Sequence, residues 1–230
     1  MARTTTSFSR AGDKLSHRLS TLHHYYRNEA HIWDVGCDHG LLGLSFIDTE
    51  TVKSINFVDP SHPVIEVLKK KIKDSYISTP DLNIHPIEGQ RIEPEQSSNL
   101  IFIAGMGGKE IGEIIQSILP KLDQTSRIVI SPHRKIIELR SLLNSLPLSL
   151  LSEKVIEEDQ QFYQILELTP SPIGMKTPLY GDSIWSGETG EKYLSHQIKH
   201  YESHKDLASQ KYLGYLKSLK PLKTTPKENL

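Results

Sequence analysis

The chain has 230 residues, a formal net charge of −1, 37% hydrophobic residues and a mean hydropathy of −0.39. This composition predicts a soluble globular protein with one sizeable core and room for one appendage. No run approaches the roughly 18 apolar residues of a membrane span, and the polar N-terminus lacks the apolar core of a secretory signal. Cys37 is the single cysteine, so an internal disulfide is excluded and we expect a cytoplasmic protein.

Charge is unevenly distributed along the chain. Residues 1–27 contain five Lys/Arg and one acid, residues 192–230 contain eight Lys and three acids, and the segment between them is acidic. Basic ends on an acidic middle suggest that a polyanion contacts the ends. The alternative, that both ends are only solvated, stays open at this point.

The spacing of apolar residues predicts a helix over residues 13–26, followed by strands that alternate with helices. The expected strands are 31–35, 54–58, 82–87, 100–104 and 127–130. The expected helices between and after them are 41–47, 63–76, 107–119 and 136–146. Alternation of this kind produces a largely parallel sheet with right-handed crossovers.

The pattern then changes. The expected strands 150–157 and 162–168 are separated by only a short turn, which predicts a hairpin. We therefore expect an α/β fold with a Rossmann-like class I methyltransferase sheet that ends in an antiparallel hairpin, plus a small α-helical C-terminal extension. A dinucleotide dehydrogenase would instead continue with parallel units.

The domain organisation follows from these elements. We expect a basic N-terminal helix (1–27) that packs on a catalytic domain (28–169), a Pro/Gly/Ser-rich linker (170–187) and a helical extension (188–230). From residue 188 to about residue 217 the extension reads as a polar helical stretch with a thin apolar stripe. Such a segment is too lean to fold alone, so it must pack on the body, on a second copy or on a ligand.

Residues 34–40, which follow the first strand, are the most informative part of the chain. A buried strand, a glycine turn and a helix N-terminus together form a nucleotide-sized pocket. A pyrophosphate favours a bare backbone, whereas Asp34 and Asp38 bring negative charge to the turn. S-adenosylmethionine (SAM), with its sulfonium, amino group and ribose hydroxyls, fits this charge better than a dinucleotide. The expected cofactor-binding residues of this segment are Asp34, Gly36, Cys37, Asp38, His39 and Gly40.

The next two strand ends supply further candidates, because parallel strands end at the same edge of a sheet. Asp59, followed by Pro60, is placed to accept both ribose hydroxyls. The alternative is a helix N-cap formed by Asp59 or Ser61. Gly89 and Gln90 follow the third strand and are candidates for the adenine edge, since an amide can donate and accept together.

Two turns complete the predicted crevice. Residues 104–108 (AGMGG) contain glycines that allow another molecule to approach closely, although a tight turn before a helix is the alternative. Residues 131–135 (SPHRK) could hold phosphate with three potential cations, although an ordinary helix start is the alternative. Met106 would face the methyl group of the cofactor. The expected cofactor-binding residues of the first turn are Ala104, Gly105, Met106 and Gly107.

His196, His200 and His204 recur every four residues, so they would share one face of the helical extension. This spacing could bind a metal, but no acid or cysteine cluster accompanies it. We expect a solvated or RNA-facing stripe and no metal site.

Four segments of the chain resemble the bacterial tRNA (adenine-N1)-methyltransferases of the TrmK family, which modify adenosine 22. They are residues 14–19 (KLSHRL), 34–40 (DVGCDHG), 103–108 (IAGMGG) and 157–164 (EEDQQFYQ). The resemblance implies a Rossmann-like SAM domain followed by a helical, coiled-coil-like C-terminal domain, with both contributing to tRNA binding. The chain departs from the family at Cys37, where we expect serine, and in the segment after the fifth strand, where a Gln-Pro-Asn type of sequence is usual.

The expected function is SAM-dependent methylation of N1 of a tRNA adenosine, at position 22 by resemblance. Adenine N1 has an in-plane lone pair, so the enzyme mainly has to align it with the methyl group. Asp38 would stabilise the cationic product ring or only anchor SAM. Asp38 and Met106 are the expected catalytic residues. Phosphate contacts are expected from Arg18, His133, Arg134, Lys135, Lys199 and Lys205.

Two other functions stay open, namely methylation of a small molecule or protein, and SAM-linked association with RNA without catalysis. An NAD(P) oxidoreductase is set aside, because no Gly-x-Gly-x-x-Gly follows the first strand and the sheet ends in a hairpin. The sequence predicts no particular oligomeric state.

Overall fold

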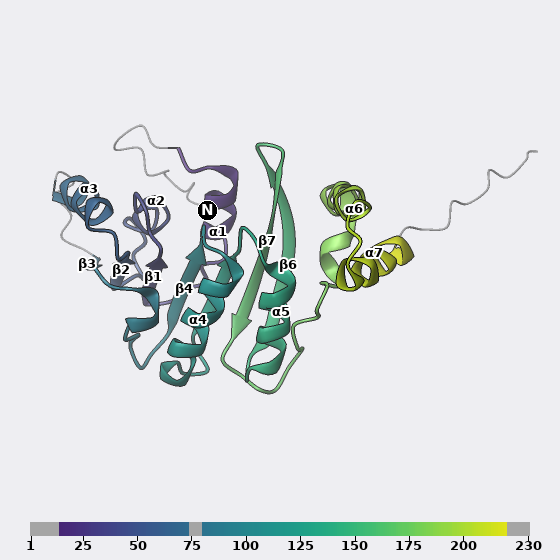
Figure 1. Cartoon of the computed structure of the whole chain (residues 1–230). Helices are drawn as coiled ribbons and strands as arrows, with labels where there is room; N and C mark the ends of the chain where they lie inside the picture. The colour runs from purple at the N-terminus through teal and green to yellow at the C-terminus, as the bar shows by residue number, and fades with distance from the viewer. Residues whose placement is uncertain (1–13, 74–79, 220–230) are drawn as a thin grey trace, which may run out of the picture.

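One sheet runs through the computed structural model, which describes residues 14–73 and 80–219 (Figure 1). Its strands are β1 (His31–Val35), β2 (Ser54–Val58), β3 (Asp81–His85), β4 (Asn99–Ala104), β5 (Arg127–Ser131), β6 (Ser149–Glu158) and β7 (Gln161–Thr169). They lie in the order β3-β2-β1-β4-β5-β7-β6. Strands β1 to β5 are parallel, whereas β7 pairs antiparallel with β5 and with β6. The predicted sheet with a terminal hairpin is confirmed.

The central strands form because their residues are apolar on both faces. β2 and β5 are buried at every position, and β4 is buried at all but its last residue. Near-continuous apolar runs of this kind are typical of parallel strands that helices cover on both sides. In the sheet register, Asp34 lies beside Phe57 on one neighbouring strand and Phe102 on the other, so the ends of these strands are level.

Helices cover both faces of the sheet (Figure 1). One face carries α1 (His17–His23), α2 (Leu41–Leu44) and α3 (His62–Lys73), and the other carries α4 (Gly108–Ile118) and α5 (Ile136–Ser145). Each layer has its own apolar cluster against the sheet. Within the described ranges, no helix has the length and apolar character that a membrane span requires.

The N-terminal helix begins at His17, later than predicted, because Ser16 caps it. The Ser16 hydroxyl oxygen accepts the backbone N–H of Leu19 at 3.3 Å. Leu22 and Tyr25 are buried in the apolar cluster of the α1 face, so this segment packs on the sheet. Two predicted helical parts, residue 13 and residues 74–76, lie outside the described residues.

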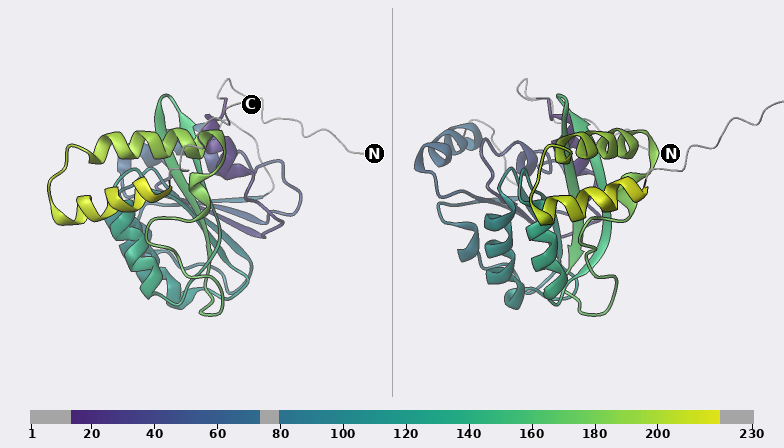
Figure 2. Two further views of the ribbon diagram at one scale, coloured as in Figure 1. Left: turned by 90° about the vertical axis from the view of Figure 1, so that its right-hand side faces the viewer. Right: turned by 45° about the vertical axis from the view of Figure 1, so that its right-hand side comes forward.

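The C-terminal extension is helical, as predicted, and it consists of two helices. α6 (Gly187–Tyr201) and α7 (Leu207–Leu219) pack against each other beyond the hairpin (Figure 2). Asp206 accepts the backbone N–H of Ser209 at 2.9 Å and thereby starts α7. The turn at residues 202–206 contains neither glycine nor proline, so the sequence carried no strong signal for it.

The helical pair buries an aromatic cluster and rests on the body of the protein. Trp185 and Tyr193 stack with ring centroids 5.2 Å apart, and Tyr212 is 3% exposed in the same cluster. Ile137 of α5 and Val155 of β6 pack against this cluster from the body. We expected the extension to pack on the body, on a second copy or on a ligand. In the described residues it packs on the body.

A buried guanidinium ties the predicted linker and α6 to the sheet. Arg140 of α5 is 1% exposed and donates to Glu153 Oε2 at 2.7 Å and to the carbonyl oxygen of Pro178 at 3.0 Å. It also donates to Gln164 Oε1, and the Gln164 amide donates to the hydroxyl of Tyr193 at 2.9 Å. A segment that reads as a linker is therefore held against the body by a charged, fully bonded network.

We predict that Arg140→Ala lowers the free energy of unfolding by about 3–5 kcal/mol, because it leaves the Glu153 carboxylate buried without its cation. Urea unfolding followed by circular dichroism measures this change. Lys109→Ala removes an exposed cation 3.8 Å from Glu113 and serves as the control, with an unchanged midpoint expected. Equal midpoints for both variants would contradict a stabilising role of the network.

Candidate active site

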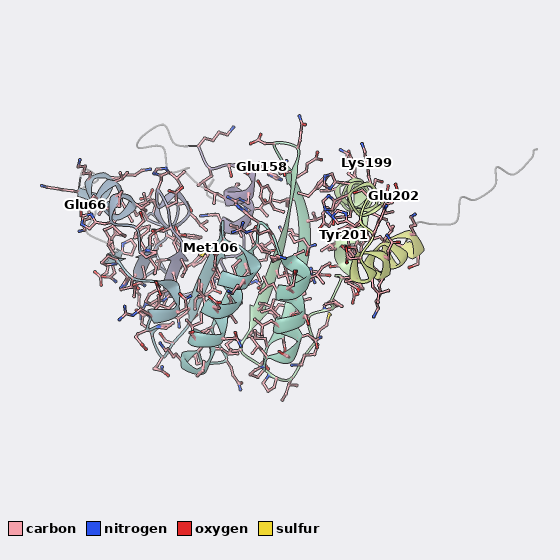
Figure 3. The ribbon with its side chains drawn as sticks, viewed as in Figure 1. Glu66, Met106, Glu158, Lys199, Tyr201 and Glu202 are labelled. Carbon is pink, nitrogen blue, oxygen red and sulfur yellow. The ribbon has the colours of Figure 1, made fainter. Side chains whose placement is uncertain are left out.

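A cavity of about 710 Å³ lies at the carboxyl ends of the parallel strands. β1 and β4 are neighbours there, but the chain continues from β1 towards β2 on one side and from β4 towards β5 on the other. Ligands of open α/β sheets bind at such a reversal of strand order. The volume lies within the range of roughly 300–1,000 Å³ that is typical of small-ligand pockets. Figure 3 shows Met106 at this edge of the sheet.

The structure separates the predicted cofactor-binding residues into two sets. Those that line the cavity are Gly36, Pro60, Gly89, Gln90, Gly105, Met106 and Gly107. Those that lie near it without lining it are Asp34, Cys37, Asp38, His39, Gly40, Asp59 and Ala104. The glycines and Met106 thus form the walls, whereas the predicted carboxylates lie behind or beside them.

The first glycine turn is shaped by close packing. Gly36 has a φ of +72°, and a Cβ atom there would lie 2.5 Å from Cε of Met106. The N–H groups of Gly36 and Cys37 donate to the carbonyl oxygen of Val58 at 2.8 and 3.1 Å, which ties the turn to the end of β2. A side chain at position 36 would therefore strain the backbone and push against the cavity wall.

Asp34 is buried beneath this turn. One of its carboxylate oxygens accepts the N–H of Gly43 at 2.9 Å, which connects the end of β1 to α2. Burial raises the pKa of Asp34 to about 7, and the negative charges of Asp38 and Asp59 add to this effect. The residue holds the turn in place, and its contact with a cofactor stays a prediction.

Asp38 is the exposed member of the turn. Its side chain is 72% exposed, its φ is +48°, and Oδ1 lies 3.6 Å from Nε2 of His39. Cys37, in contrast, packs in the apolar cluster of the α1 face, and burial raises the pKa of its thiol. The cofactor contacts proposed for these three residues stay predictions.

Asp59 makes a local bond to the backbone two residues along the chain. Its Oδ1 accepts the N–H of Ser61 at 2.8 Å just before α3 begins. This bond uses one carboxylate oxygen and leaves the other without a bond to Ser61. The Asp59 side chain thus stabilises the turn that precedes α3, and its contact with ribose stays a prediction.

The two turns after β4 and β5 form one continuous wall. Gly107 bridges to Arg134, the N–H of Gly108 donates to the carbonyl oxygen of Arg134 at 2.9 Å, and the N–H of His133 donates to Met106 O at 3.0 Å. A Cβ atom on Gly108 would lie 2.4 Å from the carbonyl oxygen of Lys135. Glycine is needed at this position because the two backbones approach so closely.

Three glutamates give this cavity an acidic side, and two of them, Glu110 and Glu113, were not predicted from the sequence. Glu88, Glu110 and Glu113 line it, and Glu110 also accepts the N–H of Gly107 at 2.8 Å. Glu110 and Glu113 are three residues apart on α4 and so share one helix face. Two glutamates three residues apart after a glycine-rich turn were the feature of the sequence that could have placed them at the cavity. A cleft lined by negative charge favours a cationic ligand.

Arg18 contacts side chains of the body, and its contact with phosphate stays a prediction. Its Nη1 contacts Nε2 of His133, and its guanidinium lies 4.8 Å from the ring centroid of Tyr163. Its backbone N–H donates to Glu158 Oε1 at 2.8 Å. Partial burial, and then the positive charge of Arg18, lower the pKa of His133. Arg18 and His133 therefore form one structural unit at the mouth of the cavity.

The other predicted RNA-binding residues divide between two places. Arg134 and Lys135 are exposed at the mouth, where Lys135 lies 3.1 Å from Glu138. Lys199 is exposed on α6, and Lys205 is exposed in the turn before α7 (Figure 3 labels Lys199). Their contacts with RNA stay predictions.

The histidine stripe is shorter than expected. α6 ends at Tyr201, so His204 lies in the turn and does not continue the helix face of His196 and His200. Its ring still lies 4.8 Å from that of His200. Across residues 14–73 and 80–219, no group of three or more His, Cys, Asp or Glu side chains is arranged to hold a metal ion.

Comparisons with known proteins show which proteins this chain is similar to. The tRNA (adenine(22)-N(1))-methyltransferase of Bacillus subtilis is 27% identical over 154 residues, which cover 66% of this chain and 64% of that protein. The chain therefore matches slightly less than two thirds of the length of that relative.

Two solved structures have the same fold. Streptococcus pneumoniae Sp1610 in complex with S-adenosyl-L-methionine has a TM-score of 0.77 at 20% identity, covering 89% of this chain and 99% of that one. The TrmK of M. capricolum in complex with S-adenosyl-homocysteine has a TM-score of 0.76 at 18% identity, covering 89% of this chain and 96% of that one. Residues 15–166 match the family described as "Methyltransferase domain". Since this match spans more than half of the sequence, the chain belongs to the methyltransferase-domain family.

Proposed function

We propose that this protein is a SAM-dependent methyltransferase that modifies N1 of an adenosine in tRNA, at position 22. The observation that carries the proposal is the acidic cavity of about 710 Å³ at the reversal of strand order. The Bacillus relative, which is named for this reaction, supports the choice of substrate. A tRNA substrate would place the protein in the cytoplasm.

The residues of the cavity fit SAM in size and charge. When bound, SAM supplies an electrophilic methyl group on a positively charged sulfonium. Glu88, Glu110 and Glu113 offer negative charge to such a cation. Side chains at Gly36 and Gly89 would clash with the wall, the latter with a Cβ atom 2.7 Å from Val35. The glycines therefore allow Met106 and Val35 to pack closely against the backbone, which shapes the wall of the cavity.

We assign the parts of the cofactor by position along the strand ends. Gly89 and Gln90 contact the adenine edge of SAM, and Asp59 with Pro60 contacts its ribose. The turn around Asp38 binds the amino-acid end of SAM. This assignment is supported by the common edge at which β1, β2 and β3 end.

The reaction requires alignment more than acid–base chemistry. SAM bound in this cavity would supply its methyl group to the lone pair of adenine N1, and S-adenosylhomocysteine would leave as the bond from the methyl carbon to sulfur breaks. The walls formed by the turns after β1 and β4 hold the two reactants in line, and such positioning contributes about 7–11 kcal/mol. The target base must first leave its stack, which costs a few kcal/mol. The methylated ring is cationic until its N6 loses a proton, and a nearby carboxylate stabilises that charge.

The direct test is analysis of tRNA after reaction. Unmodified tRNA incubated with the protein and SAM should contain 1-methyladenosine at position 22, as measured by nucleoside mass spectrometry and fragment mapping. A reaction without SAM is the control. Methylation of a different substrate class would support the small-molecule or protein alternative. SAM and tRNA binding without product would support an inactive RNA-associated protein.

Gly36→Ala tests the cavity wall. The added Cβ atom meets Met106 and must adopt a φ of +72°, so we expect a loss of SAM affinity of about tenfold. Isothermal titration calorimetry measures this change. Gly214→Ala in α7 is the matched control, since a Cβ atom there meets no atom within 4 Å. Unchanged SAM affinity in Gly36→Ala would place the ligand elsewhere.

Asp38→Asn separates catalysis from anchoring. Asparagine tolerates the φ of +48° at this position, so the variant removes charge while keeping the turn. We expect kcat to fall about 10²–10³-fold with SAM affinity nearly unchanged. Asp48→Asn, at an exposed aspartate in the turn after α2, is the control. Equal losses in turnover and SAM affinity would leave Asp38 only an anchoring role.

A further inference from the structure

A second cavity adjoins the first one. It has a volume of about 260 Å³ and lies between the turn after β5, the start of β7 and α6. His133 and Arg134 line both cavities, so the two share a wall. We call the second cavity the α6 groove. Its volume is below the roughly 300 Å³ at which small-ligand pockets begin, so it suits a single ring system better than a second cofactor.

The walls of the α6 groove carry aromatic rings that are already held in place. The ring of Phe162 lies 5.3 Å from that of His196 and 5.4 Å from that of Tyr193. Tyr201 lies edge-on to Tyr212 of α7 at 4.9 Å. Figure 3 shows Tyr201 on the α6 side of the hairpin. These contacts fix the rings before any ligand binds, which lowers the entropic cost of stacking another ring on them.

The polar groups of the α6 groove suit a neutral, hydrogen-bonding ligand. Gln161 and Gln197 contribute side-chain amides that can donate and accept, as a nucleobase edge requires. None of the described residues that line the groove carries a carboxylate, whereas the first cavity has three. Arg134 and Lys135 are exposed at its rim and can meet phosphate.

We propose that the α6 groove binds the base of a nucleotide adjacent to the methylated adenosine in the same RNA. This inference rests on the proposed function. Turning the target base out of its stack deprives the neighbouring base of a stacking partner. The aromatic rings of the α6 groove, which shares a wall with the cofactor cavity, replace the lost stacking partner. Stacking on protein aromatics is worth roughly a factor of five to 150 per base in affinity.

The α6 groove also explains why the helical extension is held so firmly to the body. α6 supplies one side of the groove through His196, Gln197 and Tyr201, and the turn after β5 supplies the other. Tyr193, which lines the groove, is bonded to Gln164, and Gln164 is in turn bonded to Arg140. The extension thus completes a binding surface that the catalytic sheet lacks alone.

A double-mutant cycle between protein and RNA tests the proposal. The protein variants are His196→Ala and, as a second groove variant, Gln197→Ala. Ser195→Ala, an exposed residue of α6 outside the groove, is the control. The RNA variants are tRNAs with an abasic nucleotide on the 5′ or the 3′ side of the target adenosine. The readout is kcat/KM, with SAM affinity and thermal unfolding measured for every variant.

We expect His196→Ala to lower kcat/KM about fivefold or more on intact tRNA, with SAM affinity unchanged. On one of the two abasic tRNAs the same substitution should cause no further loss, because the base it contacts is already absent. The proposal would be overturned if His196→Ala lowered kcat/KM on both abasic tRNAs by the same factor as on intact tRNA. It would also be overturned if kcat/KM on intact tRNA were unchanged in both groove variants. No methylation of intact tRNA by the unaltered protein would refute the proposed function itself, and this inference with it.

Discussion

The structure depends on one topological constraint, the side-by-side position of β1 and β4. These parallel strands are bonded to each other, but their chains leave the sheet in opposite directions. No crossover helix can cover the edge between them, so a crevice forms at their carboxyl ends. The turns after β1, β4 and β5 all reach this crevice, which is why segments more than 90 residues apart, such as Gly36 and His133, line one cavity.

Electrostatics divides the site into regions with different tasks. The first cavity carries three glutamates and suits a cation, whereas the adjoining α6 groove carries rings, amides and a cationic rim. Arg18 and His133 lie at the mouth as a paired unit supported by Tyr163. A positively charged cofactor and a polyanionic substrate can therefore meet at one place while each faces complementary charge.

The buried network around Arg140 connects this chemistry to the stability of the fold. It joins α5, both strands of the hairpin, the segment before α6 and, through Gln164, Tyr193 of α6. The apolar cluster of the extension and this network both hold the helices against the body. Hydrogen bonds to a guanidinium are directional, so the network adds geometric specificity to the burial.

Periodicity in the sequence by itself determined the sheet, its terminal hairpin and the edge at which the glycine turns meet. These features depend on local apolar spacing and on the geometry of parallel strands, both of which can be read along the chain. Tertiary structure alone decided that Asp34 is buried on Gly43, that Arg18 pairs with His133, and that Glu110 and Glu113 face the cavity. It also decided the turn between α6 and α7. Each of these depends on contacts or capping that leave no periodic trace, because burial and pairing are set by residues distant in sequence.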